Sequence, residues 1–359
     1  MKRGRGGSKI AWIAFLFFSL GTSWLFASET FRGHLKLADG RQIFAEYLPS
    51  RSLKPTLVML NGLTYDVSSW DPLVSELVRR DFGVLRFDFQ GQGKTLEDSG
   101  PVTEVIPYQE QVRDVDLVTK ALGLRGKLHL LGLSYGGGIA IEFARVFPHR
   151  TQEIILMAPY LRPLSNQDGW IRINVQLAQA SKELLDRGIW ITRQFPVSQD
   201  QWYDYFLRIL VSSLYPAAEP VILRHPWRLE ATYRMAQGIR KFKAHDIAHQ
   251  LQQVPVHLIE AGNDQYLPPE DLREFWKLIP ESSRNTYVRF LHTEHKIPED
   301  VPAGLADWLE KVILKQVSEG EYVFDPRKKK LESTKVKDFI PQEGARYAVK
   351  NVLRCAYFH

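Results

Sequence analysis

The stretch HLLGLSYGGGIAIEF, residues 129–143, decides the fold class of this chain. Its first half is typical of a buried strand, and the apolar residues after the glycines recur at helical spacing. Between the two halves lies Gly-Leu-Ser-Tyr-Gly, which matches the pattern G-x-S-x-G. A sharp strand-to-helix turn of this kind exposes its serine, here Ser134, in strained backbone geometry, and Gly132 and Gly136 fit it because they have no Cβ atom. The alternative is a glycine-rich turn whose serine only caps the helix.

Strands and helices alternate on both sides of this turn. A hairpin is expected over residues 34–48, with Asp39-Gly40 as its turn. Continuous apolar runs and helical spacing predict strands over 56–62, 84–89, 127–133, 153–159, 254–262 and 286–292, and helices over 70–80, 108–122, 134–147 and 302–315. Unalternating strands that are separated by helices predict an α/β protein with a mainly parallel, doubly wound sheet.

Residues 160–250 interrupt this alternation, because they contain no convincing strand. We expect helices there, and so an all-helical cap between the core segments 29–159 and 251–317. The remaining residues, 318–359, are predicted to form a basic C-terminal tail. Within the cap, the run QWYDYF brings three aromatic side chains that either line an apolar substrate pocket or pack the cap onto the sheet: Trp202, Tyr203 and Phe206.

The first 28 residues have the pattern of a targeting segment. Four basic residues precede an apolar stretch over 10–20, and small and polar residues follow. This pattern predicts a signal peptide and an exported protein, periplasmic or secreted, with an uncleaved membrane anchor as the alternative. Because the leader supplies +4 of the net charge of +6, the rest of the chain is close to neutral, which argues against nucleic acid as a partner. The single cysteine, Cys355, excludes an internal disulfide and cysteine-built metal sites.

A nucleophilic serine needs a base, and the base needs a carboxylate to orient it. The strand at 254–262 is followed by Asp264, and the strand at 286–292 is followed by His295. Ser134, Asp264 and His295 therefore follow three predicted strands in the chain order Ser, Asp, His. These three residues are the predicted catalytic triad.

Other polar residues nearby offer alternatives to this set. His292 is a second candidate base, but it ends the strand instead of lying on the loop. Glu260 and Asp271 flank the acid loop, and we expect each to be solvated or paired with a cation. Asp88 and the Gly91-x-Gly93 sequence suggest a phosphate loop, but the third glycine of that motif is missing, which favours a structural turn.

Five motifs in order resemble the α/β-hydrolase family. They are NGLTYDVSSW (61–70), DFQGQGKT (88–95), GLSYGG (132–137), GNDQYLPPE (262–270) and HKIPEDVP (295–302). The resemblance covers roughly residues 34–159 and 251–315 and implies the α/β-hydrolase fold.

The resemblance also implies an oxyanion hole formed by two backbone N–H groups. One belongs to Tyr135, directly after the nucleophile, and the other to Leu63. Leu63 follows Asn61-Gly62, which the resemblance identifies as a supporting loop. Asn61 stands where the family usually has a histidine, and that histidine generally shapes the loop rather than taking part in the chemistry.

The expected activity is cleavage of a small, apolar carboxylic ester through an acyl-serine intermediate, with no metal or organic cofactor. A lipase, a C–C bond hydrolase and an acyltransferase could use the same triad, so these alternatives stay open. An alternative of another class is a binding protein on a hydrolase scaffold. The serine argues against the dehalogenase and epoxide-hydrolase branches of the family, which use an aspartate as nucleophile. Membrane contact, where it occurs, is expected through the N-terminal segment.

Overall fold

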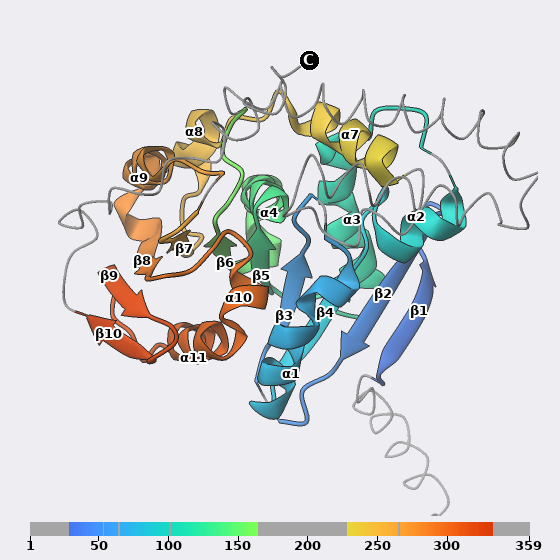
Figure 1. Ribbon diagram of the computed structural model, residues 1–359. Helices are drawn as coiled ribbons and strands as arrows, with labels where there is room; N and C mark the ends of the chain where they lie inside the picture. Colours follow the sequence, from blue (N-terminus) through green and yellow to red (C-terminus); the bar gives the residue numbers. More distant parts are fainter. Residues whose placement is uncertain are drawn as a thin grey trace, which may run out of the picture.

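The computed structural model describes residues 29–163 and 228–332, apart from positions 53, 64, 101 and 265. Within these ranges ten strands form one sheet in the order β1-β2-β4-β3-β5-β6-β7-β8-β9-β10 (Figure 1). The strands from β4 to β9 along this order are parallel, and antiparallel pairs lie only at the two ends of the sheet. The expected mainly parallel α/β sheet is therefore confirmed.

The strands follow the apolar runs of the sequence closely. β1 and β2 form the expected hairpin, and the central strands are buried on both faces, as parallel strands covered by helices must be. In chain order, the first eight strands are β1 (Phe31–Lys36), β2 (Gln42–Leu48), β3 (Thr56–Leu60), β4 (Gly83–Phe87), β5 (Leu128–Leu133), β6 (Thr151–Met157), β7 (Val256–Ala261) and β8 (Arg284–Phe290).

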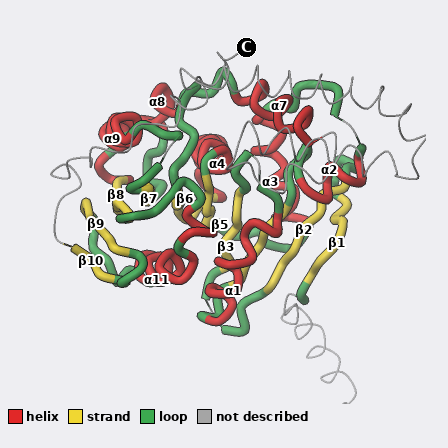
Figure 2. The backbone as a smooth tube through the Cα atoms, in the orientation of Figure 1, coloured by secondary structure: helices red, strands yellow, loops and turns green. Residues whose placement is uncertain are grey.

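Helices cover both faces of the sheet (Figure 2). One buried apolar cluster joins the sheet to α3 (Tyr108–Ala121), α4 (Tyr135–Val146), α7 (Arg228–Ile239), α8 (Ala244–Ile247) and α9 (Pro269–Leu278). A second cluster joins it to α1 (Asp71–Arg79), α10 (Ile297–Asp300) and α11 (Pro302–Ile313). The shorter elements are α2 (Gly93–Ser99) and the 3-10 turns η1 (Val67–Trp70), η2 (Pro148–Arg150), η3 (Ala248–Gln250) and η4 (Glu281–Ser283). Two packed clusters on opposite faces define the doubly wound architecture.

The sheet extends beyond residue 317, the predicted end of the core, so that boundary was wrong. β9 (Gly320–Asp325) pairs in parallel with β8, and β10 (Lys330–Glu332) pairs with β9. The physical reason is a short apolar run, in which Phe324 is fully buried and lies 5.4 Å from the ring of Trp308. Because basic residues follow this run directly, the sequence predicted a tail here instead of a strand. Residues 333–359 of the predicted tail lie outside the described part of the chain.

The predicted cap is described only at its two ends. One of the helices expected within 160–250 is present as α7, and the backbone N–H of Ala244 donates to the carbonyl of Leu161, at 2.6 Å. Leu161 lies just after β6, and Ala244 lies before β7. This bond therefore joins the two segments that flank the predicted cap. The predicted pocket residues Trp202, Tyr203 and Phe206, like the leader 1–28, lie outside the described residues. Within the ranges that are described, no helix has the length and apolar character to cross a membrane.

Candidate active site

The candidate site residues all follow the carboxyl ends of parallel strands. Asn61 follows β3, Ser134 follows β5, Asp264 comes after β7 and His295 comes after β8. Parallel strands end at one common edge of a sheet, and α/β proteins bind their ligands at that edge. β3 and β5 are direct neighbours, with Leu60 opposite Gly132 in their register. The loop after β3 therefore lies beside the serine turn.

Ser134 adopts a strained backbone conformation, with φ 50° and ψ −113°. An L-residue reaches this region only where the surrounding structure compensates for the strain. Here the N–H of Ser134 donates to the carbonyl of Met157 at 2.9 Å, and its own carbonyl accepts from Gly137 at 2.9 Å and Tyr160 at 2.7 Å. The residue is partly exposed and stands at the N-terminus of α4. The helix therefore places its first N–H groups next to the Ser134 side chain.

The glycines of the turn are required by close backbone packing. A Cβ atom on Gly132 would lie 2.5 Å from the carbonyl oxygen of Gly136. A Cβ atom on Gly136 would collide with the carbonyl oxygen of Leu60 and come within 2.8 Å of that of Asn61. The turn and the Asn61 loop thus contact each other backbone to backbone, which leaves room only for glycine.

Asp264 and His295 are brought together directly. The Nδ1 atom of His295 lies 2.8 Å from Oδ2 of Asp264. The other carboxylate oxygen, Oδ1, accepts hydrogen bonds from the backbone N–H groups of Tyr266 at 2.8 Å and Leu267 at 3.1 Å. The Asp264 side chain is only 4% exposed, so both oxygens are held by protein groups. With Nδ1–H donating to a carboxylate, the neutral imidazole carries its free lone pair on Nε2.

Two further contacts hold the acid and histidine loops together. The backbone N–H of Asn263 donates to the carbonyl of Thr293 at 2.8 Å. The ring of Tyr266 meets the imidazole of His295 edge-on, with centroids 5.0 Å apart. Tyr266 is 47% exposed although it is a large aromatic residue. Tyr266 is not among the predicted site residues, and its contact with His295 has no signal in the sequence beyond an aromatic residue within the acid loop.

The rival residues have other partners. His292 is exposed, and its carbonyl accepts a hydrogen bond from Arg327 at 3.0 Å. Glu260 is buried and accepts hydrogen bonds from the hydroxyl of Tyr287 and the guanidinium of Arg289. The third rival, Asp271, forms an ion pair with Arg162. Both carboxylates are therefore paired with a cation, which is one of the two outcomes expected for each of them.

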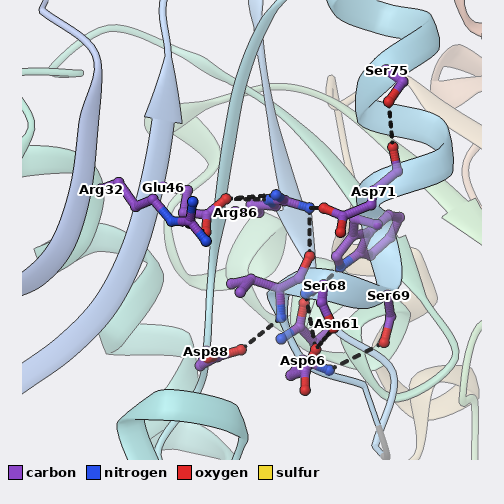
Figure 3. A network of polar contacts seen from close by, with 12 residues as sticks. Arg32, Glu46, Asn61, Asp66, Ser68, Ser69, Asp71, Ser75, Arg86 and Asp88 are labelled. Carbon is purple, nitrogen blue, oxygen red and sulfur yellow. Dashed lines mark hydrogen bonds and ion pairs between the residues drawn. The ribbon is translucent and has the colours of Figure 1, made fainter. Parts of the chain in front are cut away.

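Asp88 organises the loop after β4 and does not line a phosphate site. Its carboxylate accepts a hydrogen bond from the backbone N–H of Val67 at 2.8 Å (Figure 3). It accepts a second one from the backbone N–H of Lys94, also at 2.8 Å. A Cβ atom on Gly93 would overlap this carboxylate. The structural turn favoured by the sequence is therefore present, and it ties η1 to the start of α2.

Asn61 is fully buried and anchors the loop after β3. Its Oδ1 accepts a hydrogen bond from Nε1 of Trp70 at 2.7 Å, and its Nδ2 donates to the carbonyl of Phe87 at 3.1 Å. Next in the loop, the carbonyl of Gly62 accepts the N–H of Tyr65 at 3.1 Å. Leu63, the predicted donor, is partly buried in this turn.

Tyr135, the other predicted oxyanion donor, is the first residue of α4 and is buried. Its N–H belongs to the helix turn that has no intrahelical acceptor. Burial raises the pKa of the Tyr135 phenol well above its ordinary value. The residue can therefore offer its backbone N–H but not a phenolate. Among the described residues, no group of three or more His, Cys, Asp or Glu side chains is arranged to hold a metal ion.

Comparison with known proteins identifies the family. The family model described as serine aminopeptidase, S33, matches residues 51–301, which is more than half of the chain. The chain belongs to this family of α/β-hydrolases. The match spans the loop after β3, the serine turn, the acid loop and the histidine loop, so the described site lies wholly within the S33 region.

Individual relatives agree with this assignment. The S33 chain is 29% identical over 255 residues to the pimeloyl-[acyl-carrier protein] methyl ester esterase of Nitrosomonas europaea, covering 67% of this chain and 88% of that protein. The α/β-hydrolase MGS-M2 from a Medee basin deep-sea metagenome library superposes with a TM-score of 0.58 at 19% identity, covering 78% of this chain and 97% of that one. A thermophilic esterase from Thermogutta terrifontis gives 0.57 at 21% identity, with 79% and 98% coverage. These two structures support the fold.

Proposed function

We propose that this S33-family hydrolase cleaves carboxylic esters through an acyl-serine intermediate. The observation that carries the proposal is the 2.8 Å contact between His295 Nδ1 and Asp264 Oδ2, at the strand edge that also bears Ser134. It orients a neutral imidazole with Nε2 free to accept a proton. A base held in this way, together with a serine in a strained turn, is the arrangement that nucleophilic catalysis needs.

In the proposed reaction, Ser134 Oγ attacks the ester carbonyl carbon while His295 Nε2 takes the hydroxyl proton. The backbone N–H groups of Tyr135 and Leu63 stabilise the negative charge that develops on the carbonyl oxygen. The tetrahedral species collapses, the bond to the alkoxy oxygen breaks, and His295 delivers its proton to the leaving alcohol. Water then attacks the acyl-serine with the same base, which releases the acid and restores Ser134.

The substrate class is supported by one relative that matches 67% of this chain. The Nitrosomonas protein is an esterase that acts on a methyl ester, and we extend ester hydrolysis to this chain. We propose a small apolar ester as substrate. A series of acyl chain lengths, assayed with and without an acceptor alcohol, separates hydrolysis from acyl transfer: an acyltransferase forms the new ester at the expense of free acid.

The decisive test compares Ser134→Ala with Ser75→Ala. Ser75 lies exposed on α1, where its hydroxyl bonds the carbonyl of Asp71, so it is a matched serine outside the site. We expect the parent and Ser75→Ala to hydrolyse a short aryl ester and to be labelled by a fluorophosphonate probe. Ser134→Ala should lose both signals. Ester hydrolysis by Ser134→Ala at the parent rate would refute the proposal, and failure of the probe to label the folded parent would favour a binding protein.

We also propose that the protein is exported, because of the basic and apolar pattern of residues 1–28. Mass spectrometry of the protein expressed in its own host tests this. A mature N-terminus near residues 23–29 is expected for a cleaved signal. An intact N-terminus in the membrane fraction would instead support an anchored enzyme, and an intact chain in the cytoplasm would refute export.

A further inference from the structure

Gln92 is a buried polar residue to which the proposed chemistry gives no role. It precedes α2, within the DFQGQGKT motif, and is only 4% exposed. Its Nε2 donates hydrogen bonds to the carbonyl oxygens of Gly62 at 2.7 Å and Leu63 at 3.1 Å. Its Oε1 accepts a hydrogen bond from Nδ2 of Asn61 at 3.1 Å. All three partners belong to the loop that carries the predicted Leu63 donor.

The hydrogen-bonding capacity of the two amides fixes their orientation. Both protons on Nε2 of Gln92 are used by carbonyl oxygens, and both protons on Nδ2 of Asn61 are used by Phe87 and Gln92. The remaining oxygen of Asn61 accepts the indole N–H of Trp70. Flipping either amide would place an oxygen against carbonyl oxygens and an NH₂ group against an N–H donor. A buried polar network that is fully satisfied has one arrangement.

This arrangement sets the direction of the Leu63 N–H. The peptide that joins Gly62 and Leu63 is planar, so in its trans form the carbonyl of Gly62 and the N–H of Leu63 point in opposite directions. Gln92 and the N–H of Tyr65 hold that carbonyl from one side. The N–H of Leu63 must therefore point away from Gln92. Gly62 and Leu133, the residue before the nucleophile, are close enough that a Cβ atom on Gly62 would contact Leu133 at 3.6 Å.

The far end of the network rests on a rigid frame. The guanidinium of Arg86 donates to the carbonyl of Val67 at 2.6 Å, and Asp88 accepts the N–H of the same residue (Figure 3). Arg86 is itself fixed by Glu46 on β2. The turn η1, which ends at Trp70, is thus held from both sides, and so is the indole that orients Asn61.

We propose that Gln92 is a positioning residue for the oxyanion hole. By holding the Gly62 carbonyl, Gln92 fixes the peptide plane that directs the Leu63 N–H toward the developing oxyanion. Asn61 in turn orients the Gln92 amide and is itself oriented by Trp70. The inference rests on the proposed ester hydrolysis and names the side chains that orient one of its two backbone donors. Gln92 itself touches neither substrate nor reacting atoms.

The test removes the hydrogen-bond donor of the Gln92 side chain and keeps the side-chain volume nearly unchanged. Gln92→Met removes both donated hydrogen bonds, and Gln90→Met makes the same change two residues earlier, where the half-buried side chain has no partner for its Oε1 atom. Loss of one oxyanion donor costs about 10²–10³ in kcat, and a misdirected donor should cost about tenfold to a hundredfold. We expect that loss in Gln92→Met, with KM changed by less than about threefold, because the contact acts on the transition state. Gln90→Met should match the parent.

A second variant, Gln92→Glu, tests the same role through the pH dependence of kcat. Gln92→Glu places a carboxyl group against two carbonyl oxygens, which tolerate it only when it is protonated. The titratable side chains of the adjoining frame around η1, which are Asp66, Asp88 and Arg86, already have backbone or charged partners. We expect kcat of Gln92→Glu, relative to the parent, to fall further as the pH rises from 6 to 9. Thermal midpoints confirm that each variant is folded.

The outcomes separate this inference from the proposed function. Ester hydrolysis by Ser134→Ala at the parent rate would refute the proposed function. If Ser134→Ala is inactive but folded Gln92→Met and Gln92→Glu keep kcat within threefold of Gln90→Met at every pH, only the positioning role falls. Should Gln92→Met fail to fold, the pH dependence of Gln92→Glu decides: a profile parallel to that of the parent overturns the inference.

Discussion

Replacing Asp264 by asparagine should abolish activity while leaving the fold intact. In the parent, Oδ1 accepts two backbone N–H groups and Oδ2 accepts Nδ1–H of His295. The asparagine oxygen must stay toward the two N–H groups, because an NH₂ group there would face other donors. Its NH₂ group then faces His295 Nδ1 and forces that atom to accept. The imidazole proton moves to Nε2, which can no longer take a proton from Ser134.

The magnitude follows from this change of tautomer. A carboxylate-to-amide exchange at the orienting acid of a serine triad lowers kcat about 10⁴-fold, or about 5 kcal/mol of transition-state stabilisation. Stability should change little, since both backbone bonds to Oδ1 survive. Asp264→Ala differs, because it leaves the buried N–H of Leu267 without an acceptor, at a cost of about 1–3 kcal/mol. The alanine variant should thus lose both activity and stability.

The assay measures kcat and KM on a short aryl ester and the free energy of unfolding in urea. Asp271→Asn is the matched control, since Asp271 lies seven residues further along and pairs with Arg162 outside the triad. We expect Asp271→Asn to retain parent activity within about threefold, because its partner Arg162 lies outside the triad. If Asp264→Asn keeps more than a tenth of the parent kcat, Asp264 does not orient the catalytic base and the reasoning fails.

Three further outcomes follow from the described contacts. Burial opposes ionisation of Glu153, but a hydrogen bond with His129 at 2.7 Å and the nearby Nε2 of His257 at 3.5 Å outweigh it and hold the Glu153 pKa at about 2, below its ordinary 4.5. The ionised carboxylate therefore contributes about 3 kcal/mol to the free energy of unfolding above pH 4.5, and this contribution is lost toward pH 2. In Glu153→Gln, the free energy of unfolding should consequently fall less than in the parent when the pH is lowered from 6 to 3. Gly136→Ala should abolish fluorophosphonate labelling, since its methyl group would meet the Leu60 carbonyl; labelling at the parent rate would contradict the packing. His292→Asn should keep parent kcat, because asparagine tolerates the φ of 54° there, and a loss above tenfold would reinstate His292 as the base.

Much of the site could be predicted because it depends on strand ends. The apolar runs of the sequence locate the strands, and a parallel sheet brings their carboxyl ends to one edge. The positions of Ser134, Asp264 and His295 in the chain therefore implied their neighbourhood in space. The contact between Asp264 and His295 supports that inference, whereas the roles of Leu63 and Tyr135 as oxyanion donors stay a prediction.

Other features have no periodic signal in the sequence. β9 is six residues long and is followed by a basic run, so local composition suggested a solvated tail where pairing with β8 and burial of Phe324 decide the structure. Gln92 looked like one polar residue between two glycines of a turn. Its function depends on partners about thirty residues away in the chain, Asn61 and Gly62, and hydrogen bonds of that separation cannot be read from spacing.

The two predicted oxyanion donors are held by different means, and this difference predicts where the enzyme tolerates change. Tyr135 follows Ser134, whose backbone is fixed by main-chain hydrogen bonds to Met157, Gly137 and Tyr160 in the centre of the sheet. The Gly62–Leu63 peptide has a main-chain bond from Tyr65 and otherwise depends on the Gln92 side chain. Side-chain substitutions can therefore misdirect Leu63 without disturbing the nucleophile. Rate and stability should separate around the loop after β3, whereas around the serine turn they should be lost together.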